Sequence, residues 1–196
     1  MKTAIHTFTV AALILTTLPV RAEIELYFAQ DESPWPVELT GTVPRPAFPK
    51  SQAIAAQFLS RLQGATTESF EGYPTGSFPK TLVFGASTAT LTESDTNVCV
   101  VQAVSAPGTT QQGLLPITGT KLLVLDVGLV TQTDKFFRIE FSTPQAAFGF
   151  YGMDAERNHF RLTLTRPDGT TDDITPPIRI PQGSAGVFYL GVIDRS

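Results

Sequence analysis

The stretch Phe137–Gly152 reads FRIEFSTPQAAFGFYG, and its pattern of apolar residues decides the class of fold. Its first five residues alternate between apolar and charged. Within residues 146–151, two phenylalanines share one face of an extended chain, while Ala147, Gly149 and Tyr151 share the other. Because side chains alternate between the two faces of a strand, both segments are predicted to be β-strands that turn one face toward a core. The small residues of the second segment suggest that another element packs closely there, or that the strand bends.

The period of two recurs along the chain from Thr66 onward. Leu162–Thr165 alternates between leucine and threonine, and Phe188–Leu190 places two apolar residues on one face, so each is predicted to be a half-buried strand. Arg166–Gly169 (RPDG) predicts a hairpin turn, because proline suits the first turn position and glycine accepts a positive φ. Many short strands with frequent turns are typical of antiparallel sandwiches. We therefore expect a mainly β protein, an antiparallel β-sandwich of jelly-roll-like type.

One N-terminal α-helix is predicted to pack on this sandwich. Ser51 suits the N-cap of the helix, and Gly64 is placed to end it. Apolar residues recur between them at helical spacing, namely Ile54, Ala55, Phe58, Leu59 and Leu62. A stripe of this kind is expected to pack against the sheet rather than to bind a cofactor.

The first 22 residues have the pattern of a secretory signal peptide. Lys2 gives a positive charge, Phe8–Leu18 is an apolar run, and Val20 and Ala22 suit the −3 and −1 positions of a cleavage site. The apolar run is shorter than the roughly 20 residues that a helix needs to span a bilayer. The mature chain is therefore expected to begin at Glu23, to carry no membrane span, and to be exported to a periplasmic or extracellular space.

Three regions are expected along the chain. Residues 1–22 are the signal peptide, residues 23–50 an irregular N-terminal arm, and residues 51–196 the helix together with the β-sandwich domain. The arm contains Ile24–Phe28, which could form a strand, followed by five prolines that remove backbone donors and favour extended turns. It is expected to wrap around the domain.

The composition excludes one class of partner and one kind of cross-link. Without residues 1–22 the chain keeps 12 basic and 18 acidic side chains, a net charge of about −6. An acidic chain offers no electrostatic surface for nucleic acid, so no nucleic-acid partner is expected. Cys99 is the single cysteine and can form no intramolecular disulfide, and its valine neighbours predict a buried thiol in a strand.

No arrangement of residues indicates catalysis clearly, and we expect no enzyme. His159 is the single histidine after residue 22 and falls in a predicted loop. Ser87, Asp126 and His159 follow the order of an α/β-hydrolase triad. However, Ala89 replaces the second glycine of the nucleophile turn, and the chain after Ser87 has the pattern of a strand rather than a helix. Two carboxylates that face each other could hydrolyse a glycoside, but sequence spacing does not show which acids lie close together in the fold. The acids considered are Glu71, Glu93, Asp126, Glu140 and Asp154.

No cofactor is expected, and a calcium ion is the alternative that the sequence leaves open. Calcium binds carboxylate and carbonyl oxygens on loops. The candidate ligands are Glu71, expected just after a strand, and Asp154, expected at the end of another. Asp168, Asp172 and Asp173 flank the predicted hairpin turn and are expected to be solvated.

Sugar binding needs aromatic rings that are exposed to solvent and grouped on one face. The candidate rings are Trp35, Tyr73, Tyr151 and Tyr189. Trp35 lies between two prolines, which hold it in an extended loop, and its alternative role is to pin the arm to the sandwich.

Several segments of the chain follow the order of a known family. They are Ala56–Leu62, Glu68–Gly72, Thr88–Thr92, Phe141–Gly152 and Phe188–Asp194. Together they resemble exported bacterial β-sandwich proteins that often carry a PEP-CTERM surface-sorting tag, and the resemblance covers residues 30–194. It implies a surface or extracellular-matrix module. Relative to that pattern the chain is shorter at its C-terminus, stopping directly after the predicted strand Val187–Ile193, and lacks the tag. A strand missing there would leave an unpaired edge.

These observations favour a secreted, non-catalytic surface or extracellular-matrix module that binds or scaffolds, with polysaccharide or cell-surface components as its partners. The alternative is a carbohydrate-binding module, assisted by calcium or not, and a serine or glycoside hydrolase ranks third. A sugar binder should group exposed rings on one face. A structural module should bury its aromatic residues and disperse its acids.

Overall fold

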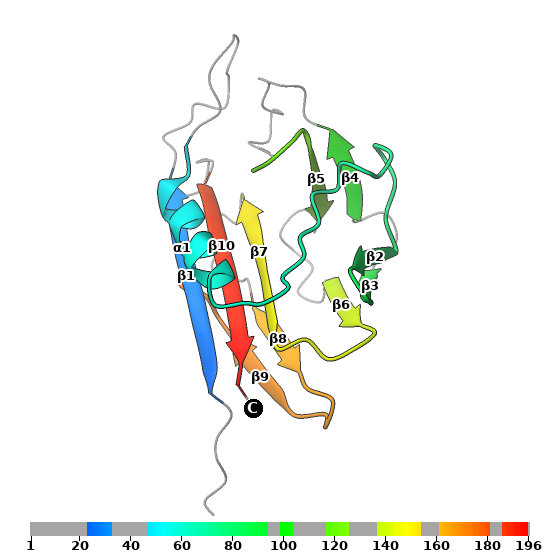
Figure 1. Ribbon diagram of the computed structural model, residues 1–196. Helices are drawn as coiled ribbons and strands as arrows, with labels where there is room; N and C mark the ends of the chain where they lie inside the picture. The colour runs from blue at the N-terminus through cyan, green and yellow to red at the C-terminus, as the bar shows by residue number, and fades with distance from the viewer. Residues whose placement is uncertain are drawn as a thin grey trace, which may run out of the picture.

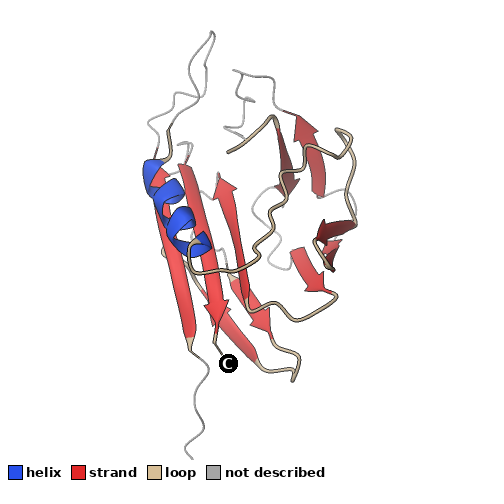
Figure 2. Ribbon diagram, viewed as in Figure 1, coloured by secondary structure: helices blue, strands red, loops and turns tan. Residues whose placement is uncertain are grey.

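The computed structural model describes residues 23–32, 47–93, 99–103, 117–125, 137–153, 161–180 and 186–195. This part of the chain contains one helix and ten strands (Figure 1). They are β1 (Ile24–Glu32), α1 (Pro49–Leu59), β2 (Thr81–Phe84), β3 (Ser87–Glu93), β4 (Cys99–Ala103), β5 (Lys121–Leu125), β6 (Phe137–Phe141), β7 (Ala147–Met153), β8 (Leu162–Thr165), β9 (Thr171–Ile174) and β10 (Gly186–Asp194). All the pairings are antiparallel. The predicted mainly β, antiparallel fold with a single helix is therefore confirmed for the described residues (Figure 2).

β10 is the central strand of a sheet with the order β1–β10–β7, which we call the helix-covered sheet. Residues 186–193 of β10 are all buried. The prediction that Phe188–Leu190 is half-buried is therefore wrong, because α1 packs on one face of the strand and Ile178 and Ile180 pack on the other. β10 itself is paired on both sides, with β1 and β7, and these two are the edge strands of the described sheet.

α1 lies on one face of this sheet, against β1 and β10 (Figure 1). Ala55 and Phe58 are buried beneath it, as the helical spacing predicts, whereas Leu59 of the same predicted stripe is 41% exposed. The ring of Phe58 lies 5.5 Å from the ring of Tyr27 and 5.8 Å from the ring of Tyr189, measured between centroids. The helix is thus docked through an aromatic contact that joins it to both strands.

Two glycines allow this close approach. Gly191 of β10 and Gly149 of β7 are opposite each other in the strand register. A Cβ atom at Gly191 would lie 2.7 Å from the ring of Phe58, and one at Gly149 would lie 3.1 Å from it. Both distances are shorter than ordinary van der Waals contact, so the helix needs residues without side chains at these positions. The prediction that an element packs against the small residues of β7 is confirmed, and that element is α1.

A strand carboxylate caps the beginning of the helix. α1 begins at Pro49, with Phe48 as the N-cap residue, and Ser51 is not the cap that the sequence predicted. Asp31 of β1 accepts hydrogen bonds from the N–H groups of Lys50 (3.1 Å) and Ser51 (2.7 Å). Two of the donors that every helix leaves free at its N-terminus are thereby satisfied, and the negative charge suits this end of the helix dipole.

Phenylalanine rings cross the opposite face of the helix-covered sheet. Phe28 of β1 contacts Phe188 of β10 (6.2 Å between centroids), and Phe188 contacts Phe150 of β7 (5.9 Å). Phe150 contacts Phe148 (5.7 Å), which in turn contacts Phe141 of β6 (5.8 Å). Because β6 belongs to another sheet, these rings connect the helix-covered sheet to the rest of the fold.

The second three-stranded sheet has the order β2–β3–β6, and β4 and β5 form a separate pair. Leu82, Ala89 and Leu91 are the buried core of this sheet, and Leu123 of β5 packs against them. The hairpin of β2 and β3 turns at Gly85, whose φ of 59° suits a two-residue turn. The hydrophobic alternation that predicted a strand at residues 88–92 is confirmed.

In the predicted arm, the possible strand at Ile24–Phe28 does form, and it extends to Glu32 and pairs with β10. Residues 61–80 form turns and bends, held by backbone hydrogen bonds of Gly76 and Ser77 with Val101 and by the side chain of Glu71. One expectation is wrong. The helix ends at Leu59, before Gly64, although Gly64 does adopt a positive φ of 70°.

Other expectations fall partly or wholly on residues that are not described. Cys99 begins β4, so the strand is confirmed, while its side chain lies outside the described atoms. The predicted signal peptide, residues 1–22, lies outside the described residues. Among the residues that are described, no helix is both long and apolar enough to cross a membrane.

Substitution of Gly191 tests whether this glycine allows α1 to pack closely on the sheet. In Gly191→Ala the new methyl group meets the ring of Phe58, and we expect a loss of about 1–3 kcal/mol in the free energy of unfolding, measured by urea denaturation. Gly72→Ala is the control, because no atom lies within 4 Å of its Cβ position. If Gly191→Ala is as stable as the wild type, the glycine does not limit the approach of the helix.

Candidate functional site

Tyr151 and Tyr189 are brought together by the register of β7 and β10, in which they are direct partners. Their ring centroids lie 4.9 Å apart with an angle of 66° between the planes, an edge-to-face contact. Tyr189 is only 4% exposed, whereas Tyr151 is half-buried. Two of the four candidate sugar-binding rings therefore form one cluster, which we call the tyrosine pair.

Gly149 makes room for the hydroxyl of Tyr189. The Tyr189 Oη atom occupies the space that a Cβ at Gly149 would need, so the ring extends from β10 across to β7. Burial raises the pKa of both phenols, and for Tyr189 the neighbouring Tyr151 adds to the rise. Both hydroxyls therefore stay protonated at neutral pH and can donate as well as accept hydrogen bonds.

The other two candidate rings do not join the tyrosine pair. Tyr73 lies beside the second sheet, where its ring packs on Phe70 at 6.3 Å between centroids. Its hydroxyl donates to the carbonyl oxygen of Thr81 at 3.4 Å. Trp35 lies outside the described residues.

Glu71, a candidate calcium ligand, holds a loop to the beginning of β5. Its Oε1 accepts hydrogen bonds from the N–H groups of Thr120 and Lys121, both at 2.7 Å, and its Oε2 accepts one from the hydroxyl of Thr120 at 3.0 Å. These donors lower the pKa of Glu71, the Thr120 N–H most. The ammonium of Lys121 donates in return to the carbonyl oxygens of Glu71 (2.9 Å) and Tyr73 (2.6 Å).

The surroundings of Glu71 are those of a structural anchor. It follows a bend in the chain and not a strand, contrary to expectation, and both of its carboxylate oxygens already accept protein donors. Asp154, the second candidate ligand, lies outside the described residues. Across the described ranges, no three His, Cys, Asp or Glu side chains gather as metal ligands would.

Ser87, a candidate nucleophile, begins β3 and is 8% exposed. Its hydroxyl accepts hydrogen bonds from Thr143 Oγ1 (3.1 Å) and Gln145 Nε2 (3.2 Å), and lies 3.4 Å from the hydroxyl oxygen of Ser142. This network joins the start of β3 to the segment between β6 and β7. It is a set of hydroxyl and amide contacts that fastens two parts of the chain together.

The remaining catalytic candidates are not brought together among the described residues. Glu140 lies on the surface, 3.8 Å from Arg138. Asp126, Asp154 and His159 lie outside the described residues, and so does the side chain of Glu93.

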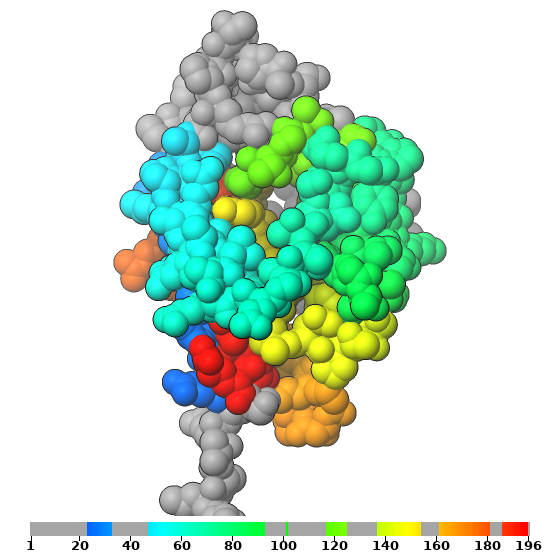
Figure 3. Space-filling view, viewed as in Figure 1, coloured from blue at the N-terminus to red at the C-terminus, as the bar shows by residue number. Residues whose placement is uncertain are grey.

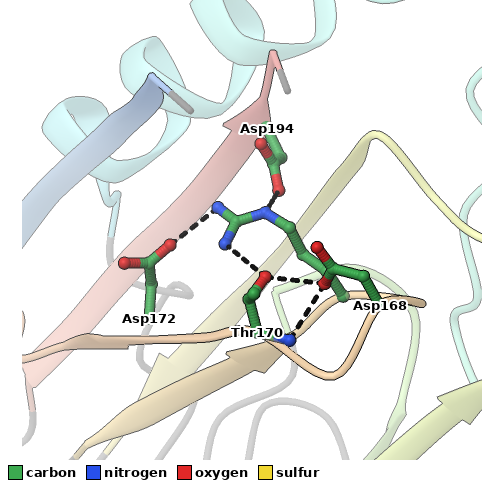
Figure 4. Close-up of polar contacts among 5 residues, drawn as sticks. Asp168, Thr170, Asp172 and Asp194 are labelled. Atoms are coloured by element: carbon green, nitrogen blue, oxygen red, sulfur yellow. Dashed lines mark hydrogen bonds and ion pairs between the residues drawn. The ribbon is translucent and has the colours of Figure 1, made fainter. Parts of the chain in front are cut away.

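Arg166 is the centre of a polar cluster that the sequence did not predict (Figure 4). Its Nε lies 2.6 Å from Asp194 Oδ2 of β10, and its Nη2 lies 2.7 Å from Asp172 Oδ2 of β9. The side chain of Arg166 is only 13% exposed. Asp194 and then Asp172 raise the pKa of Arg166, so the guanidinium stays charged and ties the β8–β9 hairpin to the end of β10.

The hairpin turn itself has the predicted form. The N–H of Gly169 donates to the carbonyl oxygen of Arg166 at 2.9 Å, and Gly169 adopts a φ of 84°. Asp168 Oδ1 accepts hydrogen bonds from the hydroxyl (2.7 Å) and the N–H (2.9 Å) of Thr170, and these lower the pKa of Asp168. Asp168 and Asp173 are exposed, as expected, whereas Asp172 is half-buried and paired with Arg166. The RPDG motif placed the turn, but Asp194, 28 residues away, could not be assigned to it from spacing.

Comparison with protein-family models, with curated proteins and with solved structures finds no match to this chain. Its site is therefore interpreted from its own geometry.

The pH dependence of stability tests the anchor formed by Glu71. Because its pKa in the folded protein is below the usual value of 4.5, the carboxylate stabilises the fold above that pH and loses this effect as the pH falls through the folded pKa. We expect Glu71→Gln to lower the melting temperature at pH 7, with the gap to the wild type narrowing below pH 4.5. Glu140→Gln, which changes an exposed acid, is the control. A gap that is equal at both pH values would contradict the anchor.

Substitution of Arg166 tests the tie between the hairpin and β10. Arg166→Gln leaves two carboxylates without their cation, so we expect a lower melting temperature by differential scanning calorimetry. Arg166→Lys should not restore it, because a single ammonium cannot reproduce the planar fork that meets both acids. Arg161→Gln is the control, since the exposed Arg161 lies 3.8 Å from Asp173 on the same hairpin. Equal melting temperatures for the two glutamine variants would contradict the tie.

Proposed function

We propose that the protein is a secreted, non-catalytic module of the bacterial cell surface or extracellular matrix, where it binds or scaffolds. The observation that carries this proposal is that its charged side chains join separate elements of the fold. Asp31 joins β1 to α1, Glu71 joins a loop to β5, and Arg166 joins the β8–β9 hairpin to β10. Charged side chains dispersed in this way, each holding two elements together, are what a structural module is expected to have.

The proposed architecture is an antiparallel β-sandwich of jelly-roll-like type. It is supported by the phenylalanine contacts, because Phe141 of the second sheet meets Phe148 of the helix-covered sheet at 5.8 Å between centroids. Two sheets that share a core are the defining feature of a sandwich. Secretion is supported by the pattern of residues 1–22.

The experiment that tests secretion is expression of the full chain in a bacterium, followed by cell fractionation and N-terminal mass spectrometry. We expect protein outside the cytoplasm that begins at Glu23 and remains with the cell-surface or matrix fraction. The matched control is Ile14→Arg, which places a charge in the apolar run and should keep the protein in the cytoplasm with an intact N-terminus. Wild-type protein that stays cytoplasmic and begins at Met1 would refute the proposal.

The second candidate function is a carbohydrate-binding module, and the tyrosine pair is the observation that favours it. A polysaccharide array, run with calcium and again with EDTA, distinguishes the possibilities. Binding that EDTA abolishes would support a calcium-assisted module, and binding that EDTA does not affect would support an aromatic platform. If folded protein binds no polysaccharide, the structural module is favoured instead.

A further inference from the structure

The four tyrosines of the chain differ in how their hydroxyls are used. The hydroxyl of Tyr27 donates to Glu25, and that of Tyr73 donates to the carbonyl oxygen of Thr81. Those of Tyr151 and Tyr189 make no hydrogen bond with any residue that the structure describes. A buried tyrosine hydroxyl usually forms a hydrogen bond with a protein group or with water. Two adjacent tyrosines whose hydroxyls form no hydrogen bond with the protein therefore require an explanation.

Tyr189 is only 4% exposed, and its hydroxyl lies beside Gly149. Within the described part of the chain, no tyrosine hydroxyl is both fully enclosed and without a hydrogen bond, so the hydroxyl of Tyr189 keeps a small contact with solvent. Tyr151, which contacts the ring of Tyr189, is itself half-buried.

A hollow lies over this part of β7. Figure 3 shows β7, in yellow, at the bottom of a depression. Its rim is formed on one side by α1 and the chain that follows it, and on another by residues 117–125. Tyr151 and Tyr189 belong to the cluster beneath α1, and Tyr151 also packs in a cluster with Ile117, which lies in the second rim segment.

The surroundings of Tyr151 are apolar. Leu62 packs with Tyr151 against the cluster beneath α1, and Ile117 and Met153 pack with it around Phe48. Lys121 of β5 donates hydrogen bonds to the carbonyl oxygens of Glu71 and Tyr73. A ligand here meets apolar side chains, one aromatic ring and two neutral hydroxyls.

We propose that this hollow binds the ring of a neutral sugar, with its C–H face on Tyr151 and its hydroxyl groups bonded to the hydroxyls of Tyr151 and Tyr189. This inference rests on the second candidate function and names its site and ligand class. An acidic sugar is disfavoured, because residues 23–196 are net acidic. Tyr73 takes no part, since it lies beside the other sheet.

The test is isothermal titration of the purified protein with three neutral hexasaccharides (cellohexaose, maltohexaose and laminarihexaose) and with hexagalacturonate as the acidic comparison. Tyr151→Phe and Tyr189→Phe remove only the two unbonded hydroxyls. We expect each to weaken binding of a neutral hexasaccharide about three- to tenfold, with the melting temperature unchanged. Tyr151→Ala, which also removes the ring, should weaken it by about tenfold or more.

Tyr27→Phe and Tyr73→Phe are the matched controls, because their hydroxyls have protein partners. Tyr27→Phe should lower the melting temperature and leave sugar binding unchanged, and Tyr73→Phe should leave sugar binding unchanged. The proposal is overturned if folded wild-type protein binds none of the neutral hexasaccharides, if it prefers hexagalacturonate, or if Tyr151→Phe and Tyr189→Phe both bind like the wild type. In each of these cases the protein can still be found in the cell-surface fraction, so the proposed secretion and structural role are judged separately.

Discussion

Phe58 reaches the helix-covered sheet only because Gly191 and Gly149 have no side chains. This contact lets α1 cover β10 closely on one face, while Ile178 and Ile180 cover it on the other. β10 thereby becomes buried on both faces, and β1 and β7 pair with its two sides. The N-terminal strand, the helix and β7 are all placed by their contacts with this one strand, which comes last among the described elements. The sheet can therefore be completed only when the two ends of the chain meet.

Charged side chains then hold the outer elements to this centre. Asp31 caps α1 from β1, and Arg166 joins the β8–β9 hairpin to Asp194 at the end of β10. Glu71 and Lys121 exchange hydrogen bonds that attach the loop before β2 to β5. Folding removes water from the polar groups of these side chains, and each contact replaces the hydrogen bonds to water that those groups lose. In the described part of the molecule these side chains serve the fold, which is why a rigid binding or scaffolding module is the reading we favour.

The tyrosine pair is different, because its two hydroxyls form no hydrogen bond with any residue that the structure describes. The sequence named Tyr151 and Tyr189 as candidates from residue type alone, together with Tyr73, which lies elsewhere, and Trp35, which falls outside the described residues. Nothing in the spacing of these residues distinguishes the pair from Tyr73. The distinction arises from the register of β7 with β10 and from Gly149, which frees the space that the Tyr189 hydroxyl occupies.

The sequence by itself determined the strands of clear alternation, such as Phe137–Phe141 and Leu162–Thr165, and the RPDG turn between β8 and β9. It also determined that an amphipathic helix packs on the sheet through Phe58. These are local features, governed by side-chain periodicity and by the φ preferences of proline and glycine. Only the tertiary structure decided that Ile24–Glu32 pairs with β10, that Asp31 caps the helix, that Asp194 meets Arg166 and that Tyr151 meets Tyr189. Each of these contacts joins residues far apart in the chain, and their partners are chosen by sheet register and packing, which no local pattern records.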